Sequence, residues 1–401
     1  MTSLLLATAL IALLLCACSA QQPEVPNAQM GSLYPFVRAT ADGSPLDLSF
    51  LNDRFSDVEA WKAQGRAKVL ELLQYSPPEC DPNAEVLERV DCGEYMREKI
   101  AFNTTPDIRV PAYVLVPKGF SGPRPAVVLL HDHGAFFVWG KEKLIGLPGE
   151  HPALTKFKEM AYSGRSVGDE LAKRGYVVIA IDMFYWGERR MLMPGDPPAW
   201  HEREKMTEED VAAFNRRSGA GTTITATGLF EAGITWSGVM FTDDLRTVDY
   251  IATRPEVDPE RIACCGLSVG GFRSAHLAGL HPRIKAAIVV GWMSTYESML
   301  QNHLTSIGFM KVIPGMYRHM DLPDIASMTV PGALMVINGT RDALFPLDGV
   351  HAAFDKMARV YAKAGVPEKF RGITYDGPHE FNAEMQDEAF AWLDRWLEPQ
   401  R

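Results

Sequence analysis

A short segment rich in glycine contains the side chain best suited to act as a nucleophile. It reads GLSVG over residues 266–270, between an apolar run, 261–265, and a stretch of alanine, leucine and small residues, 271–280. These flanks predict a strand and a helix joined by a turn so tight that larger side chains beside the serine would collide. Ser268 would be held there in a strained conformation, with its hydroxyl exposed at the helix N-terminus.

Two further polar residues follow in the chain order that such a serine requires, an acid and then a histidine. Asp342 ends a turn after the apolar stretch 330–337, and His379 lies in a loop after the predicted strand 370–375. All three candidate residues therefore come just past the carboxyl end of a predicted strand. That edge is where open α/β sheets build their sites.

The chemistry of acyl transfer explains why these three residue types are needed. A serine hydroxyl is a weak nucleophile until a base takes its proton. His379 can do so near neutral pH and can later return the proton to the leaving group. Asp342 would hold the imidazole in the correct tautomer and stabilise its cation. Asp348 and Asp376 are the nearby carboxylates that could fill this role instead.

Backbone N–H groups are expected to stabilise the oxyanion that forms during acyl transfer. One should belong to Val269, directly after the candidate nucleophile. The other should come from the loop after the predicted strand 125–130, where either Gly134 or Ala135 could donate.

The chain resembles the α/β-hydrolases, and more narrowly the bacterial group related to acetyl xylan esterases and dienelactone hydrolases. The narrower likeness covers most of residues 95–397 and rests on three stretches: HDHG at 131–134 with GKEK at 140–143, RPEVDPERI at 254–262, and GGFR at 270–273 with RIKAA at 283–287. The resemblance implies a mostly parallel central sheet with helices on both faces. We also expect an N-terminal helical arm and inserted lid segments in this chain. It also implies an ester substrate linked to a carbohydrate.

The first twenty residues are predicted to be a signal peptide. Residues 4–15 are apolar but too short to span a bilayer. The sequence LCAC at 15–18 resembles a lipoprotein processing site in which Cys18 is lipidated, and ordinary cleavage after Ala20 is the alternative. We therefore expect export to the periplasm or the outer membrane, or secretion, with a lipid at Cys18 as the only link to a membrane.

Residues 21–94 are predicted to be a tether, at 21–30, followed by an arm that packs on the catalytic domain, 95–401. Apolar residues at helical spacing predict a helix over 58–73. The segment 95–117 is predicted to form two antiparallel strands joined near Pro106.

Export would place the cysteines of the mature chain in an oxidising compartment. Cys80 and Cys92 could then form a disulfide or remain two free thiols. Cys264 and Cys265 are predicted to be small buried core residues.

Two insertions, at about 136–166 and 183–242, are predicted to determine substrate specificity, with the next helix starting near Asp243. Aromatic residues in the second insertion suit stacking on a sugar ring or an aromatic acyl group, and packing as the insertion's own core is the alternative. The candidate pocket residues are His131, His133, Trp186, Arg273 and Trp292. Arg273 could equally be a structural ion-pair partner.

Composition excludes several other classes of function. The formal charge of −10 over 401 residues gives no reason to expect nucleic acid or an anionic membrane surface as a partner. No phosphate loop or paired CxxC motif is present, so no cofactor is predicted. His131 and His133 flank one aspartate and make a metal conceivable. A loop that shapes the oxyanion site is favoured, because no other ligand cluster is evident in the sequence.

These observations predict an exported serine esterase that hydrolyses acetyl or similar esters on carbohydrates through an acyl-enzyme. A hydrolase of another ester, a lactone or a peptide bond is the first alternative. A non-catalytic surface binding protein on the same scaffold is the second.

Overall fold

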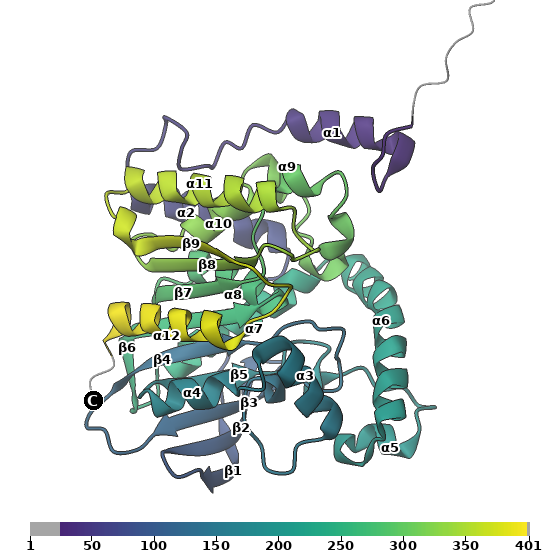
Figure 1. The fold of residues 1–401 in the computed structure, drawn as a ribbon, viewed down its shortest axis with the longest axis vertical. Coiled ribbons are helices and arrows are strands. Elements are labelled where there is room, and N and C mark those ends of the chain that lie inside the picture. The colour runs from purple at the N-terminus through teal and green to yellow at the C-terminus, as the bar shows by residue number, and fades with distance from the viewer. Residues whose placement is uncertain (1–24, 399–401) are drawn as a thin grey trace, which may run out of the picture.

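A nine-stranded sheet runs through the computed structural model, which describes residues 25–398 (Figure 1). The predicted signal peptide and Cys18 lie outside the described residues. In the order in which they pair, the strands are β1 (Glu85–Asp91), β2 (Tyr95–Thr105), β3 (Ile108–Pro117), β5 (Val177–Ile181), β4 (Arg124–Leu130), β6 (Val257–Leu267), β7 (Ile284–Val290), β8 (Ala333–Gly339) and β9 (Phe370–Tyr375).

The direction of pairing divides this sheet into two parts. The pairs from β1 to β5 are antiparallel, and all pairs from β5 through β4 to β9 are parallel. Every residue of β4, β5 and β8 is buried, as expected for parallel strands covered on both faces. The predicted mostly parallel sheet of an α/β-hydrolase fold is confirmed.

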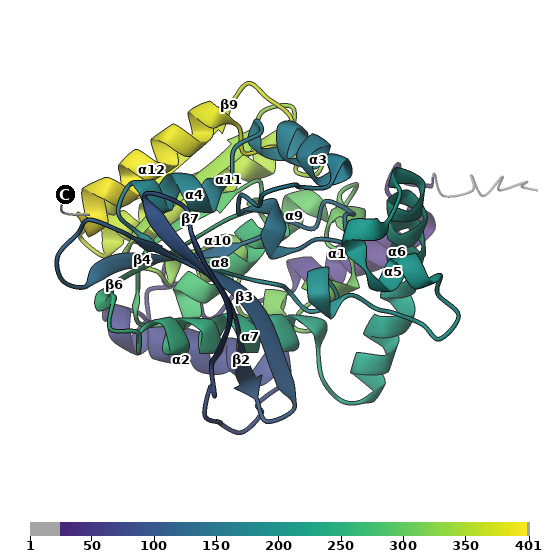
Figure 2. The same ribbon diagram turned by 90° about the horizontal axis from the view of Figure 1, so that it is seen from below.

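Helices cover both faces of the sheet (Figure 2). On one face lie α4 (Val167–Lys173), which contacts β5 and β3, and α12 (Ala383–Leu397), which contacts β7 and β8. On the other face α8 (Val269–Leu280) packs along β6 and β7. Helices that pack against α8 or against one another extend this second layer: α7 (Trp236–Ile251), α10 (Leu322–Ser327) and α11 (Leu347–Lys363).

The N-terminal arm packs on this second layer. Helix α2 (Val58–Leu73) has the predicted bounds and buries Trp61, Val69 and Leu73 where it contacts α7 and α8. The predicted strand pair is also confirmed, because β2 and β3 pair antiparallel. The edge strand β1 and helix α1 (Tyr34–Asp42) were not predicted from the sequence.

The predicted tether is described from Val25 onward, and its last part contacts the body of the protein. The Gln29 N–H donates to the Gln301 carbonyl at 2.9 Å, and the Gln29 side-chain oxygen accepts from the Leu304 N–H at 2.9 Å. The described part of the predicted tether is therefore attached to the body of the protein at Gln29.

The two predicted insertions carry mainly short helices. The first contains η2 (Lys141–Lys143) and α3 (Pro152–Tyr162). The second contains η3 (Gly187–Arg189), α5 (Pro198–His201), η4 (Arg203–Lys205) and the long helix α6 (Glu208–Glu231), which runs along one side of the molecule (Figure 1). Helix α7 starts at Trp236 and not near Asp243, because Thr235 caps it by accepting from the Gly238 N–H.

A third connection, between β7 and α10, was not singled out from the sequence. It carries α9 (Tyr296–Met299), η5 (Leu304–Ser306), η6 (Phe309–Lys311) and η7 (Met316–Arg318). The remaining short helices are η1 (Gly31–Leu33) and η8 (Pro367–Lys369). Within residues 25–398, no helix has both the length and the apolar character needed to cross a bilayer.

The cysteines of the described chain are all free thiols. Cys80 and Cys92 are half-buried and not bonded to each other, so the disulfide alternative is not what the structure shows. Cys264 and Cys265 are buried in β6, which confirms their predicted place in the core.

Candidate active site

Ser268 occupies a strained turn between β6 and α8. Its backbone angles are φ 59° and ψ −120°, a conformation that a residue with a side chain rarely adopts. The turn needs glycine on both sides because the backbones approach closely. A Cβ on Gly270 would lie 1.9 Å from the Leu130 carbonyl oxygen, and one on Gly266 would lie 2.5 Å from the same atom.

Backbone hydrogen bonds hold this turn against the end of β7. The Ser268 N–H donates to the Val290 carbonyl at 2.8 Å, and the Ser268 carbonyl accepts from the Phe272 N–H at 2.9 Å as α8 begins. The serine is 8% exposed and directly precedes the helix N-terminus. Unpaired N–H groups there favour negative charge, which suits a developing oxyanion.

Asp342 and His379 are brought together although 37 residues separate them. His379 Nδ1 lies 2.6 Å from Asp342 Oδ2, and the carboxylate also accepts from the Leu344 N–H at 2.9 Å. A carboxylate at Nδ1 favours the proton on that nitrogen and leaves Nε2 free to accept one. His379 Nε2 is buried and has no hydrogen-bond partner among residues 25–398.

The histidine lies beside the strand end that holds the serine. A Cβ on Gly291 would be 2.9 Å from His379 Cε1, so the ring packs directly on the residue that follows Val290. Ser268 and His379 therefore both contact the Val290–Gly291 segment. The two side chains therefore lie at the same strand end, and no hydrogen bond joins them in the described structure.

The two alternative carboxylates are placed elsewhere. The Asp376 side chain is 82% exposed and pairs with Arg341, and Asp348 accepts from the Gly349 N–H at the start of α11. Asp342 is therefore the carboxylate that contacts His379.

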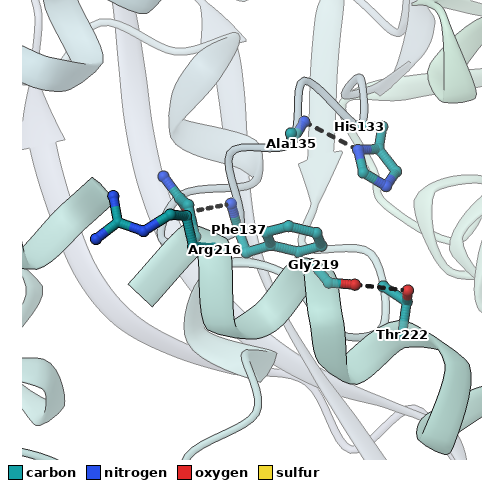
Figure 3. A pocket seen from close by; sticks show the side chains of 7 residues that line it. His133, Ala135, Phe137, Arg216, Gly219 and Thr222 are labelled. Carbon is teal, nitrogen blue, oxygen red and sulfur yellow. Dashed lines mark hydrogen bonds between the residues drawn. The ribbon is translucent and has the colours of Figure 1, made fainter. Parts of the chain in front are cut away.

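The loop that follows β4, here called the oxyanion loop, presents the candidate oxyanion donors Gly134 and Ala135. Gly134 and Ala135 both have positive φ, at 56° and 50°. The Ala135 N–H donates to His133 Nδ1 at 2.9 Å, so in this structure that candidate donor is already engaged (Figure 3). Val269, the third candidate, is the first residue of α8, where its N–H precedes the helical hydrogen bonds.

A buried lysine and a tyrosine hold this loop in place. Lys143 Nζ donates to the Asp132 carbonyl at 3.0 Å, to Asp132 Oδ2 at 3.1 Å and to the His133 carbonyl at 3.2 Å. The Tyr162 hydroxyl donates to Asp132 Oδ1 at 2.6 Å. Burial lowers the pKa of Lys143, and the Asp132 carboxylate opposes that shift. The HDHG and GKEK stretches noted in the sequence therefore form one structural unit.

A second buried lysine lies behind this unit, among three carboxylates. Lys141 Nζ lies 2.9 Å from Glu142 Oε1, 2.7 Å from Asp182 Oδ2 and 2.6 Å from Glu188 Oε1. These carboxylates are close enough to share a metal ion, but the ammonium group lies among them and supplies the positive charge. The carboxylates raise the pKa of Lys141 despite its burial, whereas Lys141 and Arg203 hold the pKa of Glu142 well below its usual value.

The structure corrects three of the predicted pocket assignments, because these side chains lie fully in the interior. Arg273 pairs with Asp244 through bonds of 2.5 and 2.9 Å, which makes it a structural ion-pair partner. His131 Nε2 accepts from the Met183 N–H at 3.1 Å, and burial keeps the pKa of His131 well below its usual value. Trp186 stacks behind the oxyanion loop and donates to the His133 carbonyl at 3.2 Å.

The other two differ from each other, because His133 is partly exposed and Trp292 is buried. His133 lines a cavity, as described next. Trp292 follows β7 and is 3% exposed, between Phe272 and Phe345 at ring separations of 5.1 and 5.2 Å. Its Nε1 is buried and has no hydrogen-bond partner within the described chain.

A cavity of about 350 Å³ separates the oxyanion loop from α6 (Figure 3). Its lining comprises His133, Ala135 and Phe137 from the loop and Asn215, Arg216, Gly219 and Thr222 from the helix. The Phe137 N–H donates to Asn215 Oδ1 at 2.8 Å and ties the two walls together.

The second insertion therefore lines the cavity with small and polar residues. Its aromatic residues Tyr185, Trp186 and Trp236 are buried against one another, which favours the alternative that they form the insertion's own core. The residues missed from the sequence are those of α6. The sequence contains a pattern that indicates this wall, because residues 215, 219 and 222 recur at helical spacing and share one face of a helix.

Comparison with known proteins places the chain in a family. Residues 45–389 match the Abhydrolase family. Among curated proteins, "Putative hydrolase YtaP" of Bacillus subtilis (strain 168) is 28% identical over 337 residues, which cover 84% of this chain and 100% of that protein.

Solved structures share the fold at lower identity. A "putative acetyl xylan esterase" from Bacteroides fragilis has a TM-score of 0.66 and 20% identity, covering 86% of this chain and 84% of that one. A glucuronoyl esterase from Solibacter usitatus has a TM-score of 0.57 and 13% identity, covering 84% and 93%. The family match spans most of the chain and includes Ser268, Asp342 and His379, and the sheet is mostly parallel, as expected. The chain belongs to the Abhydrolase family.

Proposed function

We propose that this protein is a serine esterase that removes acetyl or similar acyl groups from carbohydrates. The observation that carries the proposal is the strained Ser268 turn beside a His379 ring whose Nδ1 is bound by Asp342 and whose Nε2 is free. Structural neighbours named as acetyl xylan and glucuronoyl esterases support a carbohydrate-linked ester.

The reaction follows from these positions. Ser268 Oγ attacks the ester carbonyl carbon while His379 Nε2 takes its proton, and Asp342 stabilises the resulting imidazolium. The oxyanion accepts hydrogen bonds from the Val269 N–H and from the loop of Gly134 and Ala135. His379 then gives the proton to the departing alcohol. Water repeats the sequence on the acyl-enzyme, which releases the acid and restores Ser268.

The test is acetate release from acetylated xylan and acetylated xylo-oligosaccharides by the wild-type protein. We expect acetate from both. If p-nitrophenyl acetate is cleaved but neither saccharide releases acetate, the esterase stands and the carbohydrate assignment is wrong. If no ester is cleaved and a fluorophosphonate does not label Ser268, the proposed enzyme activity is wrong.

Asp342→Asn is expected to lower kcat for p-nitrophenyl acetate by about 10⁴-fold, because an amide at His379 Nδ1 favours the wrong tautomer while the geometry is kept. The matched control is Asp376→Asn, which changes an exposed carboxylate on the neighbouring loop and should keep wild-type activity. Equal activity of Asp342→Asn and wild type would show that this carboxylate has no part in the reaction.

We also propose that the protein is exported and anchored by a lipid at Cys18, on the basis of the apolar stretch and the LCAC sequence at its N-terminus. Fractionation of a bacterial host should place the wild-type protein with the membranes and Cys18→Ala in a soluble exported fraction. If the wild-type protein is found in the soluble periplasm, the proposed lipid anchor is wrong and the proposed export is supported. Wild type in the cytoplasm would overturn both.

A further inference from the structure

We propose that the ammonium group of Lys311 binds an anionic oxygen group of the substrate, such as a carboxylate, beside Ser268. The inference rests on the proposed esterase function and narrows its substrate class. The anionic group could be carried on the acyl side or on the alcohol side of the ester.

A chain of short contacts leads from the nucleophile to this lysine. The Ser268 N–H donates a hydrogen bond to the Val290 carbonyl. Gly291 packs against His379, and Trp292 follows at the same strand end. The Trp292 Cβ lies 3.0 Å from where a Cβ on Gly271 would stand, so the indole begins against the first turn of α8. Lys311 Nζ lies 5.4 Å from the centre of the Trp292 ring.

The backbone at Lys311 is anchored in the protein. Its neighbour Met310 is buried, and the Met310 carbonyl accepts from Ser237 Oγ of α7 at 2.8 Å. Phe309 contacts Phe230 of α6 at a ring separation of 6.4 Å. The short helix η6 is therefore attached to both α6 and α7, and Lys311 is carried on a supported segment.

Lys311 differs from the buried lysines of the described chain, because its side chain is only partly buried and has no acceptor. Lys141 and Lys143 lie on carboxylates, and Lys158 donates to the Ile145 carbonyl at 2.8 Å and also pairs with Glu150. Residues 25–398 provide Lys311 Nζ with neither a hydrogen bond nor an ion pair, only the face of Trp292. A partly exposed ammonium group without a protein acceptor is accessible to an anionic group of the substrate, and a charge-assisted hydrogen bond would stabilise that contact.

The surroundings of Lys311 offer hydrogen-bond donors and positive charge. The unpartnered Trp292 Nε1 is a donor only. The charges of Lys311 and then Lys143 add to burial in lowering the pKa of His133, so the field of Lys311 reaches the cavity wall. A ligand that fits these groups must be an acceptor, and an oxygen anion satisfies both the donors and the field.

The experiment compares matched neutral and anionic esters. On the acyl side the pair is 4-nitrophenyl acetate and 4-nitrophenyl hydrogen succinate. On the alcohol side it is acetylated xylo-oligosaccharides without and with a glucuronic acid branch. Wild type should prefer the anionic member of one pair, and Lys311→Met should lower that preference, taken as a ratio of kcat/KM values, by about tenfold, since charge-assisted hydrogen bonds are the strong ones. Lys311→Arg should retain most of it.

The matched control is Lys369→Met. Lys369 Nζ also lies over a tryptophan, 5.5 Å from the ring of Trp396, but it precedes β9 at the opposite end of that strand from the loop of His379. This variant should keep the wild-type ratio. An unchanged ratio in Lys311→Met, with both esters still cleaved, would overturn the inference and leave the esterase intact. Loss of all cleavage by wild type would instead overturn the proposed function.

The preference should also depend on pH. Partial burial lowers the pKa of Lys311 to about 8, so the ammonium form is present below that pH and is lost above it. His133 faces it from the oxyanion loop and is kept neutral by burial, and Phe230 and Ser237, which contact η6 from α6 and α7, carry no charge. The ratio of anionic to neutral kcat/KM should therefore fall as pH rises through about 8 in wild type and stay flat in Lys311→Met.

Discussion

Ser268→Ala is expected to lower kcat for p-nitrophenyl acetate by about 10⁴-fold or more, because no other group can form the acyl-enzyme. The residual rate over water would come from the oxyanion donors and from binding alone. The fold should be preserved, since the hydrogen bonds of residue 268 to Val290 and Phe272 use its backbone. Kinetics and thermal unfolding of the two proteins side by side measure both effects.

A matched control for this variant is Ser163→Ala. Ser163 Oγ accepts from the Ala383 N–H on an exposed part of the chain, after α3 and outside the Ser268 turn. It should keep wild-type turnover. If Ser268→Ala still hydrolysed the ester at the wild-type rate, Ser268 would not be the nucleophile, and the proposed mechanism would be wrong.

Lys141→Met is expected to destabilise the protein by about 3–5 kcal/mol, because removing one partner of a buried ion cluster leaves uncompensated charge in the interior. Glu142, Asp182 and Glu188 would then share a site without the ammonium group that lies among them. Activity should fall as well, since η2 links this cluster to the loop that carries the oxyanion donors. The free energy of unfolding from urea titration at pH 7 measures the first effect.

The sign of the pH dependence provides a second check on this cluster. The pKa of Glu142 is lowered in the folded protein, so its contribution to stability is present above the unfolded pKa and is lost as pH falls. Lys141→Met should weaken this acid-dependent part of the stability. The control Lys285→Met removes a surface lysine whose pair with Glu260 is 41% and 69% exposed, and it should change stability by less than about 1 kcal/mol. Equal stability of Lys141→Met and wild type would contradict the role given to Lys141.

Local patterns were sufficient to predict several elements. The apolar spacing over 58–73 predicted α2 with its observed bounds, because burial of one face repeats at the helical period. The GLSVG sequence with its flanks predicted the strained turn, because the glycines are required by contacts within a few residues and by the adjacent strand. Helix starts are less well marked in the sequence, and α7 begins earlier than predicted because Thr235 caps it.

Local sequence patterns do not predict contacts between residues that are far apart in the chain. Arg273 is a charged residue close to Ser268 in the sequence, which favoured a place in the pocket. The fold instead places Asp244 of α7 against it in the interior. The aromatic residues of the second insertion pack on one another, and the cavity wall is built by the polar face of α6. Lys311 lies in a connection that no motif marked, and only the packing of η6 brings it to Trp292.

By itself the sequence determined the nucleophile turn, the chain order of serine, acid and histidine, and the α/β architecture, because each depends on short-range periodicity and turn chemistry. The tertiary structure decided that Asp342, and not Asp376 or Asp348, contacts His379. It also decided which charged groups are paired in the core, and that Lys311 has no acceptor among residues 25–398. Those outcomes depend on the burial and distance of side chains that are far apart in the chain, and no local pattern specifies either quantity.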